Sequence, residues 1–397
     1  MRGLLTGLRR VQDAPVQGKT ILVRVDYNVP LKKGQIGDDS RIVASLPTLT
    51  HLLDRDAKLV LLSHLGRPEG KVVPDLRLDP VAKRLGTLLG RAVQKLDDCV
   101  GEAIQETVRR GTTGDLFLLE NVRFHPEEAT NDPEFALKLA QLGDLFINDA
   151  FATLHRAHAS TLGICSYLPS YAGLLLQKEI EAVSHLTDNP TPPYVAIVGG
   201  SKAGSKLGAL RDLLDHVDTL LIGGGVAFTF LRCKGYPVGN SPVDESLLGE
   251  IKELIKEAYE KNVLILLPHD VVIAREIDAA AETAICRAEK IPPGWLGLDI
   301  GPQTIRRFKA KIKTAKTIVW TGPMGVFELP PFAHGTEAIT EALADSDAFT
   351  VIGGGETGEA AVKMGWEKKI SYISTGGGAC LALLGGKSLP ALEALRV

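Results

Sequence analysis

Residues suited to binding a small anion recur after the short apolar runs in the first half of the chain. Such runs lie at 21–25, 58–63, 115–120 and 144–149. The polar residues that follow them are Asp26, Asn28, Arg41, His64, Arg67, Arg123 and Arg156. A guanidinium is a rigid fork that matches carboxylate and phosphate groups. One such arginine alone is more often a surface ion pair, but repetition after successive runs indicates a site for a small, highly charged anion.

The second half of the chain carries glycine where the first half carries charge. Glycine clusters lie at 199–200, 223–225, 353–355 and 376–378, each after an apolar run. Glycine lets backbone amides approach a ligand, and the N-terminus of a following helix favours anions. The set of clusters therefore indicates a phosphate-bearing ligand, in particular a nucleotide. Two lysines four residues apart, Lys202 and Lys206, would share one helix face and follow its phosphate oxygens.

One glycine pattern favours a different enzyme. Gly353, Gly355 and Gly358 fit the GxGxxG fingerprint of dinucleotide-binding folds. The acidic residue expected about 20 positions onward is absent, because residues 371–380 read SYISTGGGAC. Glu356 lies inside the loop instead, where a carboxylate suits a Mg²⁺-nucleotide better than a ribose. An NAD-dependent dehydrogenase and a non-catalytic nucleotide- or anion-binding module remain as alternatives.

Two other candidate sites are weaker. GGSKAGSK at 199–206 resembles a phosphate-binding P-loop but lacks the Gly-Lys-Ser/Thr order. His155 and His158 could share a helix face near Asp149, yet no third ligand with convincing spacing completes a zinc site. We therefore expect these histidines to be hydrogen-bonded polar residues.

The elements that position these residues are parallel strands and covering helices. Continuous apolar runs alternate with amphipathic stretches, such as 245–261 with Ile251 and Leu254 on one face. This alternation predicts α/β architecture with sheets covered on both faces. The apolar runs are too numerous for a single sheet, so we expect two doubly wound domains. A single closed barrel is the alternative architecture. A helix over about 172–186 would join the domains, dividing them as 1–175 and 176–378.

Composition limits the class of protein. A chain of 397 residues has room for two or three domains, and 45% hydrophobic with 23% charged residues is typical of a globular protein. A formal net charge of -3 argues against non-specific nucleic-acid binding. Five cysteines without a CxxC pair indicate a reducing compartment. Neither a signal peptide nor a membrane span is visible in the sequence, so we expect a soluble cytoplasmic protein with no membrane partner.

Eight segments, taken together, resemble the phosphoglycerate kinase family over essentially the whole chain. In order they are RVDYNVP, SHLGRP, ENVRF, HRAHAST, GGGVAFTFL, LDIGPQT, GPMGVFE and STGGG. The resemblance implies a two-lobed, hinge-bending, monomeric kinase that transfers the acyl phosphate of 1,3-bisphosphoglycerate to MgADP, giving 3-phosphoglycerate and MgATP. It also implies that 379–397 packs back on the first domain.

The resemblance assigns roles to individual residues. Substrate binding would fall to Asp26, Tyr27, Asn28, Arg41, His64, Leu65, Gly66, Arg67, Arg123 and Arg156. ADP or ATP would contact Lys202, Lys206, Gly301, Glu328, Gly354, Gly355, Glu356 and Thr357, with Mg²⁺ carried at Glu356. The transfer itself would use Arg41, Lys202, Gly376, Gly377 and Gly378. Two positions depart from the family pattern: Glu356 stands for the usual Asp, and Thr321 for the usual Asn.

Overall fold

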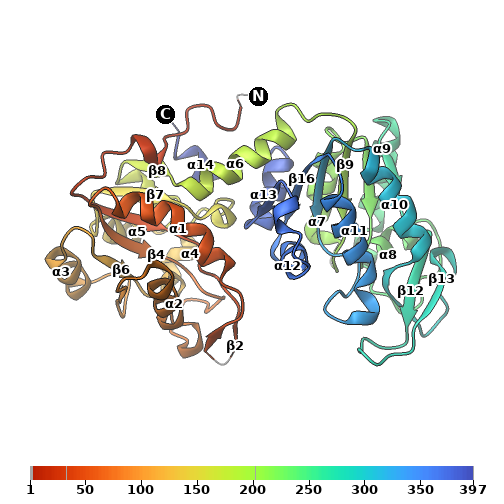
Figure 1. Cartoon of the computed structure of the whole chain (residues 1–397), viewed down its shortest axis with the longest axis horizontal. Coiled ribbons are helices and arrows are strands. Elements are labelled where there is room, and N and C mark those ends of the chain that lie inside the picture. Colours follow the sequence, from red (N-terminus) through yellow and green to blue (C-terminus); the bar gives the residue numbers. More distant parts are fainter. Residues whose placement is uncertain (1–2, 33, 202, 397) are drawn as a thin grey trace. The chain divides into compact units, whose positions relative to one another are not determined.

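The chain forms two compact units (Figure 1). The computed structural model describes residues 3–32, 34–201 and 203–396. Unit 1 runs to Glu181 and includes the C-terminal residues from Ser388, and unit 2 comprises Ala182–Lys387. The boundary falls inside helix α6 (Leu174–Thr187), close to the helix expected at 172–186. The sequence placed the two divisions at 175/176 and 378/379, somewhat before the observed ones.

Unit 1 is built on a six-stranded parallel sheet with the order β5-β6-β4-β1-β7-β8. The strands are β1 (Thr20–Arg24), β4 (Lys58–Leu62), β5 (Gln94–Lys95), β6 (Leu116–Leu118), β7 (Leu145–Asn148) and β8 (Ser170–Ala172). β1 lies between β4 and β7 and pairs with both in parallel register. Strand order therefore reverses at β1, and in open α/β sheets ligands bind outside the carboxyl ends of strands at such a point.

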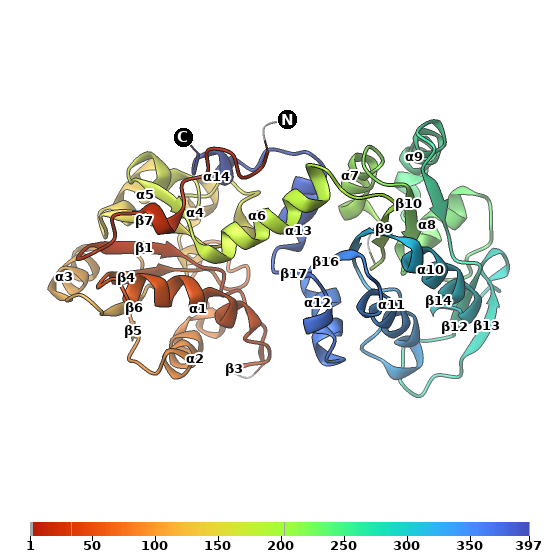
Figure 2. The same ribbon diagram turned by 45° about the horizontal axis from the view of Figure 1, so that its top comes forward.

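Helices cover both faces of this sheet (Figure 2). Ile21 and Val23 of β1 pack into one apolar layer, and Leu22 packs into the other. The first layer includes α1 (Ser40–Leu53) and α2 (Asp79–Leu89), and the second includes α3 (Glu102–Arg110) and α5 (Pro133–Ala140). Burial on both faces explains why the strands read as continuous apolar runs rather than as alternating ones.

Short elements complete unit 1. A hairpin of β2 (Leu31–Lys32) and β3 (Gln35–Ile36) precedes α1, and a helical turn, α4 (Pro126–Thr130), precedes α5. The C-terminal segment carries α14 (Pro390–Glu393), and Arg9 N–H donates to the Leu395 carbonyl at 3.0 Å. The end of the chain is thereby fixed against its beginning.

Unit 2 contains a second six-stranded parallel sheet, ordered β11-β10-β9-β15-β16-β17. Its strands are β9 (Tyr194–Val198), β10 (Thr219–Ile222), β11 (Leu264–Leu266), β15 (Thr317–Thr321), β16 (Phe349–Gly353) and β17 (Tyr372–Ser374). Counted within the sheet, this is the 3-2-1-4-5-6 order of doubly wound nucleotide-binding folds. The expectation of two doubly wound α/β units is confirmed, and the closed barrel is excluded.

The remaining elements of unit 2 were only partly expected. Its helices are α7 (Gly204–Leu213), α8 (Val226–Cys233), α9 (Leu248–Glu260), α10 (Pro302–Thr314), α11 (His334–Ala344), α12 (Gly355–Lys363) and α13 (Gly377–Leu384). A small antiparallel sheet of β12 (Asp270–Ala274), β13 (Ala284–Arg287) and β14 (Leu296–Ile300) was not foreseen. Nowhere along the described ranges is a helix both long and apolar enough to cross a membrane.

Candidate active site

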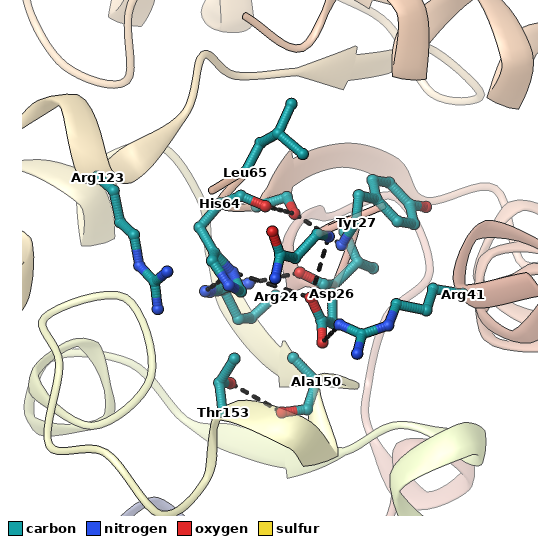
Figure 3. A network of polar contacts seen from close by, with 12 residues as sticks. Arg24, Asp26, Tyr27, Arg41, His64, Leu65, Arg123, Ala150 and Thr153 are labelled. Atoms are coloured by element: carbon teal, nitrogen blue, oxygen red, sulfur yellow. Dashed lines mark hydrogen bonds and ion pairs between the residues drawn. The ribbon is translucent and has the colours of Figure 1, made fainter. Parts of the chain in front are cut away.

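A buried carboxylate at the carboxyl end of β1 holds an arginine from the next helix (Figure 3). Asp26 is 8% exposed and accepts a hydrogen bond from Arg41 Nη1 at 2.5 Å. Its other oxygen accepts the backbone N–H of Asn28 at 3.1 Å, and the amide oxygen of Asn28 accepts the N–H of Gly66 at 2.8 Å. Arg41 is in the first turn of α1 and stays 27% exposed. The buried Asp26 carboxylate therefore fixes the direction of the Arg41 guanidinium, which stays partly accessible to solvent.

His64 is a neutral, oriented hydrogen-bonding group. It follows β4, is 4% exposed, and receives a hydrogen bond at Nδ1 from Arg24 Nη2 at 3.1 Å. Arginine can only donate, so Nδ1 must accept and the ring proton is on Nε2. Burial, with the charges of Arg24, Arg123 and other arginines, holds the pKa of His64 well below its usual value. His64 can therefore donate to an anion through Nε2 without titrating near neutral pH.

Three further arginines follow strands β4, β6 and β7 of the same sheet. Arg123, in the short turn 122–124, donates from Nη1 to the Gly66 carbonyl at 2.7 Å. Burial and the charges of Arg156 and Arg24 lower the pKa of Arg123 to about 10. Arg156 donates from Nε to His155 at 3.1 Å, and Arg67 is exposed. Arginines that depress one another's pKa values signal positive charge in excess, which is what an anion site needs.

Two predicted substrate residues are core residues in the structure. Tyr27 is fully buried, and its hydroxyl lies 2.9 Å from Ser45 Oγ inside the apolar layer beneath α1. Leu65 is 2% exposed, and its carbonyl accepts a hydrogen bond from Asn121 at 2.7 Å. Their side chains pack inside the unit, and their substrate contact stays a prediction, which the backbone of the two loops would have to make. Gly66, at φ +64°, closes the second loop.

The structure adds a buried charge pair that the sequence analysis did not select. Arg24 is 1% exposed and donates from Nε to Ser160 Oγ at 2.9 Å. Ser160 in turn donates from its hydroxyl and its backbone N–H to the fully buried Glu128, at 2.7 and 2.8 Å. The available signal was an arginine inside the otherwise apolar run ILVRV. A charge within a buried strand needs a partner, so it marks a site or its support.

In unit 2 the turns that follow the carboxyl ends of the strands are formed largely by glycine, so backbone groups are exposed there in place of charged side chains. After β9, the ammonium of Lys206 donates to the Gly199 carbonyl, and its pKa is lowered to about 8 by burial, which the Glu356 carboxylate partly opposes. Gly322, after β15, has φ +81°, and a Cβ there would lie 2.1 Å from the Lys206 nitrogen. The turns after β9 and β15 therefore pack closely around the Lys206 ammonium. The prediction for Lys202 falls outside the described residues.

Two helix N-termini lie together at the ends of β16 and β17. Gly354, at φ +110°, precedes α12, and Gly376 precedes α13. A Cβ on Gly377 would lie 2.8 Å from the Cα of Gly354, so these backbones approach closely. Adjacent N-termini offer free N–H donors and positive dipole ends to phosphate.

The predicted polar residues of this loop differ in their surroundings. Thr357 is buried, and its hydroxyl accepts the Gly322 N–H at 2.8 Å, which ties the two loops together. Glu356 is exposed in the first turn of α12. Glu356 is therefore the group of the pair that is open to a ligand, whereas Thr357 supports the loop.

A cavity of about 280 Å³ adjoins these turns. Its lining is largely apolar and includes Gly225, Phe228, Leu296 and Pro323. Three carboxylate residues also line it, Asp299, Glu328 and Glu356. Gly301 is not among the lining residues. It is buried against Asp270, where a Cβ would lie 2.4 Å from the carboxyl carbon, so it allows Asp270 to cap α10. Its nucleotide contact stays a prediction, and the neighbouring Ile300 does line the cavity.

Comparisons with known proteins agree with this arrangement. A sequence model of the family described as Phosphoglycerate kinase matches residues 11–387. The phosphoglycerate kinase of Moorella thermoacetica is 51% identical over 385 residues, covering 97% of this chain and 98% of the relative. That of Pelotomaculum thermopropionicum is 50% identical, covering 98% of each chain.

Solved structures of phosphoglycerate kinases also match the fold of this chain. The phosphoglycerate kinase of Coxiella burnetii matches with a TM-score of 0.85 and 40% identity, over 98% of both chains. The phosphoglycerate kinase of Pyrococcus horikoshii matches with a TM-score of 0.88 and 33% identity, again over 98% of both chains. With matches of this extent in sequence and in structure, the chain belongs to the phosphoglycerate kinase family.

Proposed function

We propose that this chain catalyses the reversible transfer of the acyl phosphate of 1,3-bisphosphoglycerate to ADP, with unit 1 holding the phosphoglycerate and unit 2 the nucleotide. The observation that carries the proposal is the set of arginines and His64 at the carboxyl ends of the unit 1 strands. This surface has an excess of positive charge and a neutral donor, as a small phosphorylated carboxylate requires.

On unit 1 we assign the non-reacting phosphate to three arginines, Arg67, Arg123 and Arg156, together with His64. Asp26 and Asn28 would orient the hydroxyl and carboxylate of the substrate. Arg41 is held by Asp26 yet remains partly exposed, and it would contact the phosphoryl group in transfer. A guanidinium already aimed at developing charge stabilises a transition state without reorganising first.

On unit 2 the nucleotide would occupy the cavity, with Glu328 at the ribose. Lys206 and the amides of Gly354 and Gly355 would hold its phosphates, while Lys202 and the Gly376–Gly378 amides would share the charge of the transferring group. Mg²⁺ fits this donor set, because Glu356 offers an exposed carboxylate beside the cavity and Mg²⁺ prefers oxygen ligands. Bound with the nucleotide, the ion would neutralise phosphate charge.

Little proton chemistry is needed. The acceptor in the reverse direction is a carboxylate, ionised at neutral pH, so no general base is required. Catalysis then consists of positioning and charge stabilisation. Since the two ligands are assigned to different units, transfer would require closure of the units around them, which would also exclude water from the acyl phosphate.

An assay with 1,3-bisphosphoglycerate and ADP separates this proposal from its two alternatives. Formation of ATP that depends on Mg²⁺ is the expected result. Oxidation of NADH without ATP formation would instead support the dehydrogenase suggested by GxGxxG. Binding of both ligands with no turnover would support a non-catalytic module.

A further inference from the structure

Three side chains of different metal-ligating chemistry meet in unit 1, apart from the anion site. Asp98 and Cys99 lie in the loop after β5, and His125 lies between the turn at 122–124 and α4. The carboxylate oxygen, thiol sulfur and imidazole nitrogen all lie within 4.8 Å of one another. No residue of this cluster has a role in the proposed phosphoryl transfer.

We propose that Asp98, Cys99 and His125 form a binding site for one borderline-soft divalent cation, of which Zn²⁺ is the representative. A thiolate, an imidazole and a carboxylate are the three ligand types that zinc takes in proteins. A hard cation such as Mg²⁺ prefers oxygen ligands alone, so the cluster selects against the ion assigned to the nucleotide.

The separations suit a small tetrahedral site. Zinc bonds of about 2.0–2.3 Å place ligand atoms roughly 3.3–3.7 Å apart. His125 Nε2 and Asp98 Oδ1 are now 2.7 Å apart, and no pair exceeds 4.8 Å. Side-chain shifts of about 1 Å would therefore complete three bonds. Asp98 is exposed, so solvent can reach the site and supply a water as the fourth ligand.

The surroundings orient each donor. The ring of His125 stacks on Phe135 with centroids 5.0 Å apart, which fixes its plane. Asp98 Oδ1 also accepts the Cys99 N–H at 2.6 Å, so the two neighbouring ligands are held together. The Cys99 sulfur is buried and donates to the Glu120 carbonyl at 3.0 Å. Binding of the ion would release the thiol proton and move the imidazole proton to Nδ1.

Titration of the metal-free full chain with Co²⁺ tests the proposal. We expect one bound ion with a thiolate-to-cobalt charge-transfer band and tetrahedral d–d bands, displaced by Zn²⁺ and unaffected by excess Mg²⁺. Zn²⁺ should also raise the midpoint of thermal unfolding, because it binds only the folded site. Absence of a cobalt–thiolate band would overturn the proposal.

Matched variants locate the site. Cys99→Ser should abolish the charge-transfer band and the thermal shift, whereas Cys165→Ser, the control for another thiol of unit 1, should retain both. His125→Gln changes a partly exposed side chain and should fold normally, as checked by circular dichroism, while weakening Co²⁺ binding at least tenfold. Persistence of the band in Cys99→Ser, or unchanged affinity in His125→Gln, would overturn the assignment.

Discussion

The two units offer different groups to the anions assigned to them. At the strand ends of unit 1, charged side chains are assigned to the ligand, and the buried Asp26 holds one of them, Arg41, in place. At those of unit 2, glycines expose the backbone, and Lys206 is the charged side chain enclosed by the turns. A small rigid anion can be matched by rigid guanidinium forks, whereas a flexible polyphosphate is followed by backbone amides and helix N-termini.

This contrast has consequences for mutation. In unit 1, removing a guanidinium leaves a buried carboxylate without its partner, so the damage is electrostatic and concentrated. In unit 2, adding a single methyl group to a glycine displaces backbone donors, so the damage is steric. Each kind of change should affect the ligand of its own unit and leave the other ligand's affinity intact.

The largest effect is expected for Arg41→Ala. Loss of one preorganised donor to developing charge typically lowers kcat by about 10²–10³-fold. We expect a fall in kcat of at least about a hundredfold, with the Kd for ADP changed less than about twofold, because ADP is assigned to unit 2. Steady-state kinetics and calorimetric titration with ADP measure the two quantities.

The matched control is Arg110→Ala. Arg110 is an exposed arginine of α3 that pairs with Glu106 on the same helix. Exposed pairs of this kind contribute little, so its kcat should equal that of the wild type. Near-normal turnover in Arg41→Ala would remove Arg41 from the transfer step.

The next largest effect is expected in unit 2, for Gly377→Ala. The added Cβ would lie 2.8 Å from the Cα of Gly354, so the two turns must separate. Misplaced phosphate donors should raise the nucleotide Kd about tenfold or more. The Kd for 3-phosphoglycerate should not change. Gly249→Ala, in α9 with nothing within 4 Å of its new Cβ, serves as the control. Equal loss of both affinities would show general unfolding instead of a local effect.

The sequence predicted the fold and the strand-end positions because local patterns encode them. Apolar runs predicted β1, β4 and β7 to within a few residues, since strands buried on both faces leave an uninterrupted signal. The antiparallel sheet β12–β14 escaped detection because β13 is mostly exposed and has no comparable apolar run. Short strands such as β5, with two residues, offer too little pattern to detect.

Site chemistry was predicted less completely, because partners distant in sequence determine it. Whether Tyr27 faces a ligand depends on Ser45, which lies in another element. The tautomer of His64 depends on Arg24, and the charge of Arg24 is balanced through Ser160. Such relations arise only when strands pair, so residue type and spacing could locate the site but not assign every side chain its direction.

A difference in pH dependence between the units follows from Lys206. Its pKa is lowered to about 8, so its ammonium is mostly charged at pH 7 and mostly neutral at pH 9. The part of nucleotide affinity that needs this charge is present below pH 8 and lost above it. We expect the Kd for ADP to rise about tenfold from pH 7 to pH 9, since a pKa near 8 leaves roughly a tenth charged at pH 9.

Substitution checks that this titration belongs to Lys206. Lys206→Met should bind ADP weakly and show a flat profile over the same range in calorimetric titrations. Lys256→Met, an exposed lysine on α9, should keep the wild-type slope. A slope that persists in Lys206→Met would assign the titration to another group.

The smallest effect on affinity is expected for His64→Gln, in unit 1, where binding should not depend on pH as it does in unit 2. His64 is neutral, so glutamine removes one neutral hydrogen bond to substrate, a loss of about 0.5–1.5 kcal/mol or roughly two- to tenfold in Kd. Between pH 7.5 and 9 the Kd for 3-phosphoglycerate should stay constant in the wild type, because Arg123, with a pKa of about 10, remains charged. Nitrogen NMR should show the Nε2–H tautomer of His64 throughout that range. A ring titration above pH 6.5, or a loss beyond a hundredfold, would mean that His64 binds as a cation, and the side-chain charge of unit 1 would then titrate near neutrality as well.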